Sequence, residues 1–318
     1  MLILLLGLTG TEIRKQNTVK ISDYLDRDEI ARFTAKSDVH AWRLFLANWL
    51  GIAAIFAVVG IYPNIITIPL AVVLLAGRQL GLAVLMHEAG HRTLFRTPWL
   101  NDVLGQWFCA LPIFNDLPSY ARGHLAHHQK AGTHDDPDLP NYAAYPISPE
   151  SFRRKALRDF TGQTGIKLLT YLARGEAGVM SHEPGKPGRT FYLQLLTQLI
   201  LFAVLWAFGI GWAYLLWLGS FMTVFMFIIR VRQVAEHAAV PDLYDSDPRM
   251  NTRTVEAPWW QRLLFAPNGV NYHMEHHFMA SVPCYRLAAL REHLRRREAL
   301  VGVPQFNGYG ALLRHAIG

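Results

Sequence analysis

The feature that most constrains this chain is a run of 39 residues, 191–229, that contains no Asp, Glu, Lys, Arg or His. One helix of that length would measure roughly 58 Å, about twice the thickness of the hydrocarbon core of a bilayer. Gly209-Ile210-Gly211 interrupts the run near its middle. We therefore expect two membrane-spanning helices, at about 191–209 and 211–229, joined by a tight turn.

A second pair of apolar segments lies earlier in the chain. Residues 45–62 carry no charge, and residues 65–86 are apolar except for Arg78-Gln79, with Pro63-Asn64 as a turn signal between them. In lipid the backbone must satisfy its own hydrogen bonds, so these segments are expected to be helices. The sequence predicts an all-α integral membrane protein with four transmembrane helices in two hairpins. The alternative is a soluble protein with four buried helices, which seldom stay uncharged over such lengths.

The basic residues predict the orientation of these helices. Lys and Arg exceed Asp and Glu by 31 − 24 = +7, and 30 of the 31 basic residues lie in 1–44, 87–190 or 230–318. By the positive-inside rule, both termini and the middle segment face the cytoplasm. We expect one domain over 1–318, with a helical cytoplasmic cap made by 87–190 and 230–318. The positive charge thus indicates topology and no nucleic-acid partner. The lack of an endoplasmic-reticulum retention tail favours a bacterial inner membrane over the endoplasmic reticulum.

Four shorter segments carry weaker signals. Residues 1–10 are apolar but short, and we expect them at the membrane interface or tucked against the protein. Residues 103–114 are too short to cross a bilayer and predict a re-entrant or interfacial helix. Residues 151–175 mix basic and apolar positions at helical spacing, which fits a helix on the membrane surface or an ordinary surface helix of the cap. Residues 175–190 are rich in Gly and Pro and predict a flexible loop.

Histidines are clustered in the three short motifs HEAGH, HLAHH and HMEHH, and one more follows the last apolar run in RQVAEH. Positions i, i+3 and i+4 of a helix lie on one side about a turn apart, so each motif directs several imidazoles at one region. Burying them unpaired is costly, whereas neutral imidazole binds iron, zinc, copper or nickel. Because nine ligands exceed what one ion accepts, the predicted site holds two metal ions. Its ligands are His87, His91, His124, His127, His128, His237, His273, His276 and His277.

The order HxxxH, HxxHH, HxxHH, with apolar segments between the motifs, resembles the membrane fatty acid desaturase and hydroxylase superfamily. The likeness covers about residues 40–300 and includes HEAGHRTLF, HLAHHQKAGTHDDPDL and NYHMEHHFMASVPCYRL. The resemblance implies a non-haem diiron enzyme that uses O2, with two Fe ions held by the nine histidines. It also implies a separate electron donor of the ferredoxin or cytochrome b5 type, since the sequence has no GxGxxG after a strand, no CxxC and no flavin fingerprint.

Metal-bound histidines usually donate their second N–H to a carboxylate or a carbonyl. Candidates for that role are Glu88, Glu236, Glu275, Asp135, Asp136 and Asp138. Gln233, one turn before His237, and Asn271, two residues before His273, are candidates to hold a water at the metal. All these polar residues could instead be ordinary solvated positions of the cap. Arg78, the one charge within a predicted span, either contacts a polar group of the substrate, or pairs within the bundle or snorkels to the interface. We favour the second alternative.

These observations predict O2-dependent oxidation of an unactivated C–H bond in a lipidic substrate that enters from the bilayer. We favour fatty acyl desaturation; the alternative is a hydroxylase or ketolase of an acyl chain, a carotenoid or another apolar molecule. HEAGH also matches the HExxH motif of a zinc intramembrane protease with Glu88 as base, but that leaves seven histidines unexplained. A metal-dependent membrane receptor or transporter is a further, non-enzymatic alternative.

A basic cluster, Arg295, Arg296 and Arg297, lies near the end of the chain. It could steer an acidic electron donor by long-range attraction. We favour the simpler interpretation, that these residues are ordinary positive-inside charge.

Overall fold

The computed structural model describes residues 21–174 and 189–318. The predicted interfacial segment 1–10 and nearly all of the predicted loop 175–190 lie outside the described residues. Helices form almost all of the regular structure in the described part. The strands found there, β1 (Val255–Glu256) and β2 (Phe306–Asn307), pair in parallel over two residues.

Four helical rods in the described part of the chain are long and apolar enough to cross a membrane, as predicted. They are α2 (Asp38–Ile61), α3 (Thr67–Gly90), α8 (Arg189–Ala207) and a continuous rod over Gly211–His237. The last rod contains α9 (Tyr214–Ser220), a π-helical turn, η6 (Phe221–Phe225), and α10 (Met226–His237). Two rods extend beyond their predicted spans, to Gly90 and His237, and therefore carry histidines of the predicted metal site on rigid helical extensions.

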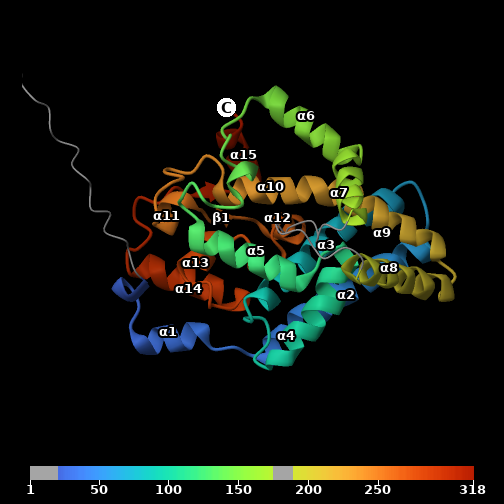
Figure 1. Cartoon of the computed structure of the whole chain (residues 1–318), viewed down its shortest axis with the longest axis horizontal. Coiled ribbons are helices and arrows are strands. Elements are labelled where there is room, and N and C mark those ends of the chain that lie inside the picture. Colours follow the sequence, from blue (N-terminus) through green and yellow to red (C-terminus); the bar gives the residue numbers. More distant parts are fainter. Residues whose placement is uncertain (1–20, 175–188) are drawn as a thin grey trace, which may run out of the picture.

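Helix α3 is the central element of the fold (Figure 1). It packs against α2, α5 (Leu117–Lys130), α9, α10 and α12 (Trp259–Leu264). Its polar Gln79 is fully buried and donates from Nε2 to the Trp217 carbonyl at 2.9 Å, while Ser220 donates to the Val72 carbonyl at 2.8 Å. These bonds fix α3 against α9, and so they position the HEAGH motif at the end of α3.

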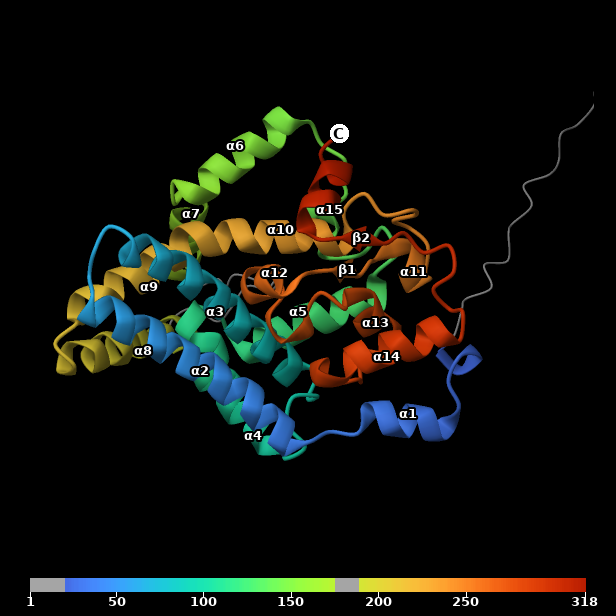
Figure 2. The same cartoon turned by 180° about the vertical axis from the view of Figure 1, so that it is seen from behind.

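Helices α2 and α8 bury only a narrow side, and Figure 2 shows α2 along the outer edge of the molecule. Their outward sides are covered with large apolar side chains. Exposed examples are Leu46, Leu50, Val58, Ile61, Leu195, Leu199, Val204 and Trp206. A contiguous apolar surface of this kind is unfavourable in water and is typical of contact with lipid.

Ten shorter α-helices complete the described part of the fold. They are α1 (Arg27–Thr34), α4 (Pro98–Leu104), α5, α6 (Pro149–Phe160), α7 (Gln163–Ala173), α11 (Pro248–Asn251), α12, α13 (His273–Phe278), α14 (Cys284–Arg296) and α15 (Tyr309–Ala316). The start of α5 is well defined, because Asp116 accepts from the Ser119 backbone N–H at 3.2 Å and a proline occupies the first turn. This N-terminal capping defines where α5, the helix that carries the HLAHH motif, begins.

The segment predicted as one helix at 151–175 is divided into α6 and α7. The break lies at Gly162, whose φ of 77° is left-handed and is readily adopted only by glycine. Asp159, at the end of α6, is fully buried and binds Arg230 of α10 through two hydrogen bonds of 2.5 and 2.8 Å. That ion pair holds α6 and α7 against the rod that leads to His237.

The segment predicted as a short interfacial helix at 103–114 belongs to a longer irregular rod. It consists of α4, a π-helical turn, η2 (Gly105–Ala110), and a 3-10 turn at Leu111–Ile113. Its outer side exposes Trp99, Trp107 and Phe108. Trp side chains are enriched at membrane–water interfaces, but an interfacial or re-entrant position for this segment stays a prediction.

Candidate metal centre

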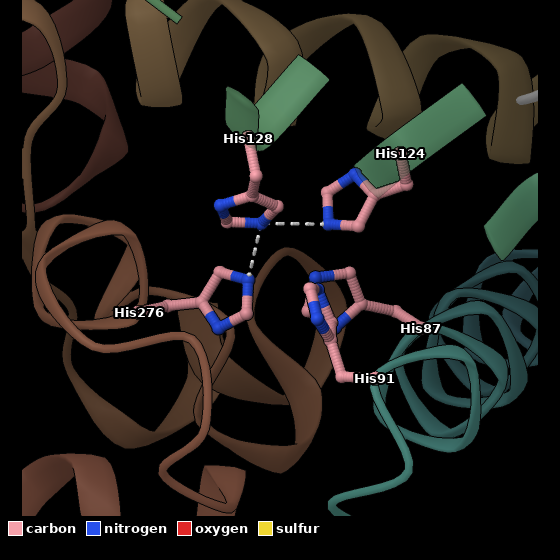
Figure 3. A group of neighbouring side chains, drawn as sticks. All are labelled: His87, His91, His124, His128 and His276. Carbon is pink, nitrogen blue, oxygen red and sulfur yellow. Dashed lines mark hydrogen bonds between the residues drawn. The ribbon is translucent and has the colours of Figure 1, made fainter. Parts of the chain in front are cut away.

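The structure brings the nine predicted histidines together as two adjacent groups. In the described residues, the first group consists of His87, His91, His124, His128 and His276, which converge from three directions in Figure 3. The second group consists of His127, His237, His273 and His277. In each group, one ring nitrogen of every histidine lies within 4.8 Å of the others. Both groups lie where α3 and α10 end and α5 and α13 pack beside them.

Each HxxHH motif contributes to both groups. On α5, His124 and His128 belong to the first group, whereas His127 belongs to the second. On α13, His273 and His277 belong to the second group, whereas His276 belongs to the first. Residues i and i+4 are nearly eclipsed on a helix, and residue i+3 is offset by about 100° from i+4. The motif therefore serves two neighbouring sites from one helical turn.

The distances between ring nitrogens fit a shared cation. His128 Nε2 lies 3.0 Å from His124 Nε2 and 2.9 Å from His276 Nε2, as the dashed lines in Figure 3 mark. With the zinc–imidazole bond of about 2.0–2.1 Å as a guide, two nitrogens on one ion lie about 2.9 Å apart at a right angle and roughly 3.4 Å apart at a tetrahedral angle. Among the described residues, the buried Nε2 atoms of His87 and His91 have no hydrogen-bond partner, as expected for atoms reserved for a metal.

The outer nitrogens of four histidines are held by protein oxygens. His127 Nδ1 lies 2.8 Å from Asp136 Oδ1, and His87 Nδ1 lies 3.1 Å from Glu88 Oε1. Because a carboxylate oxygen only accepts, Nδ1 carries the hydrogen and Nε2 keeps its lone pair. His237 Nδ1 faces the carbonyl oxygen of Asn251 at 3.0 Å, and His273 Nδ1 lies 3.5 Å from Glu236 Oε1. These contacts orient the Nε2 atom of each ring towards the other histidines of its group.

Asp136 is the best-held of the three aspartates that follow the second motif. It accepts from His127, from the Tyr142 hydroxyl and from the Asp138 backbone N–H. Burial alone would raise the pKa of Asp136, but its hydrogen bonds with His127 and Tyr142 outweigh burial and lower the pKa. Asp138 Oδ2 lies 3.7 Å from His127 Nδ1, whereas Asp135 is exposed.

Glu88 and Glu275 connect different pairs of helices. Glu88 Oε2 accepts from the Thr93 hydroxyl at 2.8 Å and from the Cys284 backbone N–H at 2.9 Å, which joins α3 to the start of α14. Glu275 binds Arg291 Nη1 at 2.6 Å and the Thr254 hydroxyl. Glu275 thus ties α13 to α14, and Glu88 alone of the two contacts a histidine ring in the described structure.

Burial keeps five histidines of the site uncharged. It lowers the pKa of five rings outside the apolar rods, and neighbouring histidines lower it further. These are His124, His128, His273, His276 and His277. Neutral imidazole is the form that binds a metal ion, so the site is preorganised for metal at neutral pH.

A cavity of about 110 Å³ adjoins the second group. Gln233 lines it beside His237, as its position one turn earlier on the helix predicts. Asn271 instead donates from Nδ2 to the Val255 carbonyl at 3.0 Å and accepts at its own carbonyl from the Val255 N–H, which attaches β1 to the approach of α13. Of the two candidate water holders, Gln233 is therefore the one that faces open space.

Arg78 contacts the cap. Its Nη2 donates to the Leu263 carbonyl at 2.8 Å, near the end of α12, in agreement with the favoured interpretation that it pairs within the protein. The basic cluster near the C-terminus is also paired. Arg295 binds Glu292 and Arg297 binds Glu29, at 3.1 and 2.9 Å. This pairing weakens the argument that the cluster steers an acidic donor.

Several supporting residues gave no signal in the sequence. Tyr142 and Thr93 bind the carboxylates that hold His127 and His87, and the Asn251 backbone carbonyl holds His237. A backbone carbonyl has no side-chain signature. The Tyr142 hydroxyl is brought to Asp136 by a tight series of turns, in which the Asp138 N–H also points at the same carboxylate.

A mostly helical fold with four long apolar rods and two converging groups of histidines is typical of a membrane-bound metalloprotein. A sequence model of the fatty acid desaturase family matches residues 63–308, and this chain belongs to that family.

Several proteins named as desaturases are similar to the chain. Dihydrorhizobitoxine desaturase of Bradyrhizobium elkanii is 27% identical over 69% of this chain and 65% of its own length. The sn-1 oleoyl-lipid 12-desaturase of Anabaena variabilis is 25% identical over 69% of this chain and 66% of its own. A sphingolipid delta(4)-desaturase DES1-like protein of Arabidopsis thaliana is 27% identical over 67% and 58%. The chain thus spans between 58% and 66% of the length of these relatives.

Proposed function

We propose that this chain is a membrane-bound, iron-dependent oxidoreductase that uses O2 to desaturate a lipidic substrate. The observation that carries the proposal is the convergence of nine imidazoles, in groups of five and four, at the ends of two apolar helices. Family membership and the names of its relatives support desaturation. The nine histidines would hold two Fe ions.

Iron bound there would supply O2 activation and the power to remove hydrogen from an unactivated C–H bond. Desaturation takes one hydrogen from each of two adjacent carbons. O2 accepts these two hydrogens together with two electrons and two protons, and leaves as two molecules of water. The electrons require a separate donor of the ferredoxin or cytochrome b5 type, and the name of an omega-3 relative from Nostoc includes ferredoxin.

The residues of the chain orient the ligands and exclude water. Asp136, Glu88, Glu236 and the Asn251 carbonyl fix the rings of His127, His87, His273 and His237, as described above. Nearly all of these side chains are buried. Rigid, dry positioning of this kind favours oxidation of the substrate over side reactions.

The proposed topology places the metal centre at the cytoplasmic face of a membrane, with both termini on that side. The structure supports it because α3 and α10 both end at the histidines, while the apolar sides of α2 and α8 face outward. We propose a bacterial inner membrane, and a lipidic substrate that reaches the site from the bilayer.

The zinc protease alternative conflicts with the position of Glu88. That residue is 1% exposed, and its carboxylate contacts His87, Thr93 and the Cys284 N–H. A general base in a hydrolase needs access to a water.

The test is expression in a bacterial host that supplies lipids, with a co-expressed ferredoxin and reductase, followed by mass spectrometry of total lipids. A product lighter by two hydrogens supports desaturation. A product heavier by one oxygen assigns the site to hydroxylation instead. Unchanged lipids in cells whose purified protein carries iron would contradict the proposed oxidation.

A further inference from the structure

The cavity beside the second histidine group has a polar wall close to the proposed metal centre. Its volume of about 110 Å³ is well below the 300–1,000 Å³ typical of pockets that enclose a drug-sized ligand. It can therefore take only one segment of a substrate. The wall includes His127, His237 and His273, so that segment lies beside the second metal position.

Arg232 is the strongest polar feature of this wall. It is 6% exposed, and its Nε donates to Glu236 Oε1 at 2.6 Å. Within the part of the chain that the structure describes, no oxygen accepts from its two terminal nitrogens, Nη1 and Nη2. Neither nitrogen is among the fully buried atoms without a partner, so these N–H groups reach the cavity, where an oxygen of a bound molecule can accept from them.

Gln233 adds a second hydrogen-bonding group beside Arg232. Its side chain lines the same cavity and has no hydrogen-bond partner among residues 21–174 and 189–318. Gln233 precedes His237 by four residues, a helical rise of about 6 Å. An extended hydrocarbon chain covers that distance within a few carbon–carbon bonds. A group bound here therefore lies only a few bonds from a carbon placed at the metal.

The charges around the cavity favour an uncharged oxygen. The positive charge of Arg232 is already matched by Glu236 at 2.6 Å. Asp138 also lines the cavity, and its Oδ2 lies 3.7 Å from His127 Nδ1. Arg232 therefore brings N–H donors to the cavity but no unmatched positive charge of its own, and a carbonyl or hydroxyl oxygen needs only the donors.

We propose that Arg232 and Gln233 bind an uncharged carbonyl or hydroxyl oxygen of the substrate, within a few bonds of the C–H bond that is oxidised. This rests on the proposed oxidation function and narrows it to amides, esters or alcohols that react near their polar end. Both residues act here as specificity determinants.

The test compares two probes of equal chain length, dodecanamide and dodecane. The full-length protein is purified in detergent, loaded with Fe(II) and supplied with reduced ferredoxin and O2. Sites that hydrogen-bond a substrate can reject an analogue that lacks the group by factors of 10⁴ or more. We expect dodecanamide to be oxidised at least about 100-fold faster than dodecane, within the first few carbons from the amide. Equal rates, or oxidation towards the methyl end, would overturn the proposal.

Two variants and one control separate this role from folding. Arg232→Lys keeps a cation beside Glu236 but lacks the planar fork, and Gln233→Leu removes a side chain without partners. Each is expected to reduce the preference for the amide at least about 10-fold. Arg230→Lys, on the same helix but paired with Asp159, is the control and should keep the preference. Variants that retain the wild-type preference would refute the assignment.

A binding measurement distinguishes failure of the proposal from failure of the proposed function. Dodecanamide should raise the unfolding temperature of the iron-loaded wild-type protein more than dodecane does, and Gln233→Leu should remove that difference. Stabilisation without O2 consumption would uphold the oxygen-binding cavity and reject the oxidation function. Equal stabilisation by both probes would reject the cavity proposal, whatever the turnover.

Discussion

His237 and His273 face each other with their Nε2 atoms 2.9 Å apart, while both Nδ1 atoms point away, to the Asn251 carbonyl and the Glu236 carboxylate. With hydrogens on Nδ1, the two Nε2 lone pairs meet directly. Such a contact is repulsive unless a cation lies between the two rings. This pair is the clearest physical reason to expect a metal ion in the second group.

We predict that His237→Ala loses one ion and keeps the other. The second group falls to three imidazoles, whereas the five histidines of the first group are untouched. Iron content, measured by mass spectrometry of the purified protein, should fall from about two to about one per chain, and turnover should be lost. His134→Ala, an exposed histidine stacked on Tyr244, is the control and should retain both ions. Loss of no iron would contradict the assignment of His237.

Asp136 and Asp135 provide a matched pair of substitutions. Asp136→Asn weakens the acceptor that orients His127, and such changes typically cost 10–100-fold in metal affinity or activity. Asp135→Asn changes an exposed side chain and should have little effect. Iron titration of the metal-free proteins measures the difference. Equal affinities of the two variants would argue against orientation of His127 by Asp136.

Arg78→Leu should lower stability without lowering turnover. The variant loses the 2.8 Å hydrogen bond to the Leu263 carbonyl, worth about 1 kcal/mol at a partly exposed site. Thermal unfolding in detergent and the rate of product formation are the two measurements. A variant as stable as the wild type that has lost turnover would favour the substrate-binding role instead.

The metal-free protein should become less stable as pH falls. Burial lowers the pKa of five histidines of the site, so the folded chain leaves them neutral while the unfolded chain protonates them below about pH 6.5. Protons therefore favour unfolding, by on the order of 1 kcal/mol per pH unit for each histidine that stays neutral. Unfolding by denaturant at about pH 7.5 and pH 5.5 tests this. Equal free energies of unfolding at the two pH values would count against burial of neutral rings.

Much of this architecture follows from local sequence patterns. The uncharged runs predicted the four apolar helices, and the i, i+3, i+4 spacing singled out the nine histidines that the structure gathers. Spacing alone did not show how they divide, because the division depends on how α5 and α13 face each other. The choice of Asp136 over Asp135 depends on turn geometry around Tyr142, and the carbonyl of Asn251 has no sequence signal at all.

The break between α6 and α7 was not predicted, although the sequence contains a signal for it. Gly162 lies in the middle of the segment, and a glycine inside a helical pattern is a warning of a turn. The contact that accompanies this break is the ion pair between Asp159 and Arg230, which holds the end of α6 against α10. No local pattern in the sequence indicates this long-range pair.

Metal analysis of catalytically active, detergent-purified protein tests the central claim most directly. The account predicts about two iron ions per chain, together with loss of O2-dependent turnover on chelation and its return when Fe(II) is added back. A content of one zinc per chain, or full activity without iron, would contradict it.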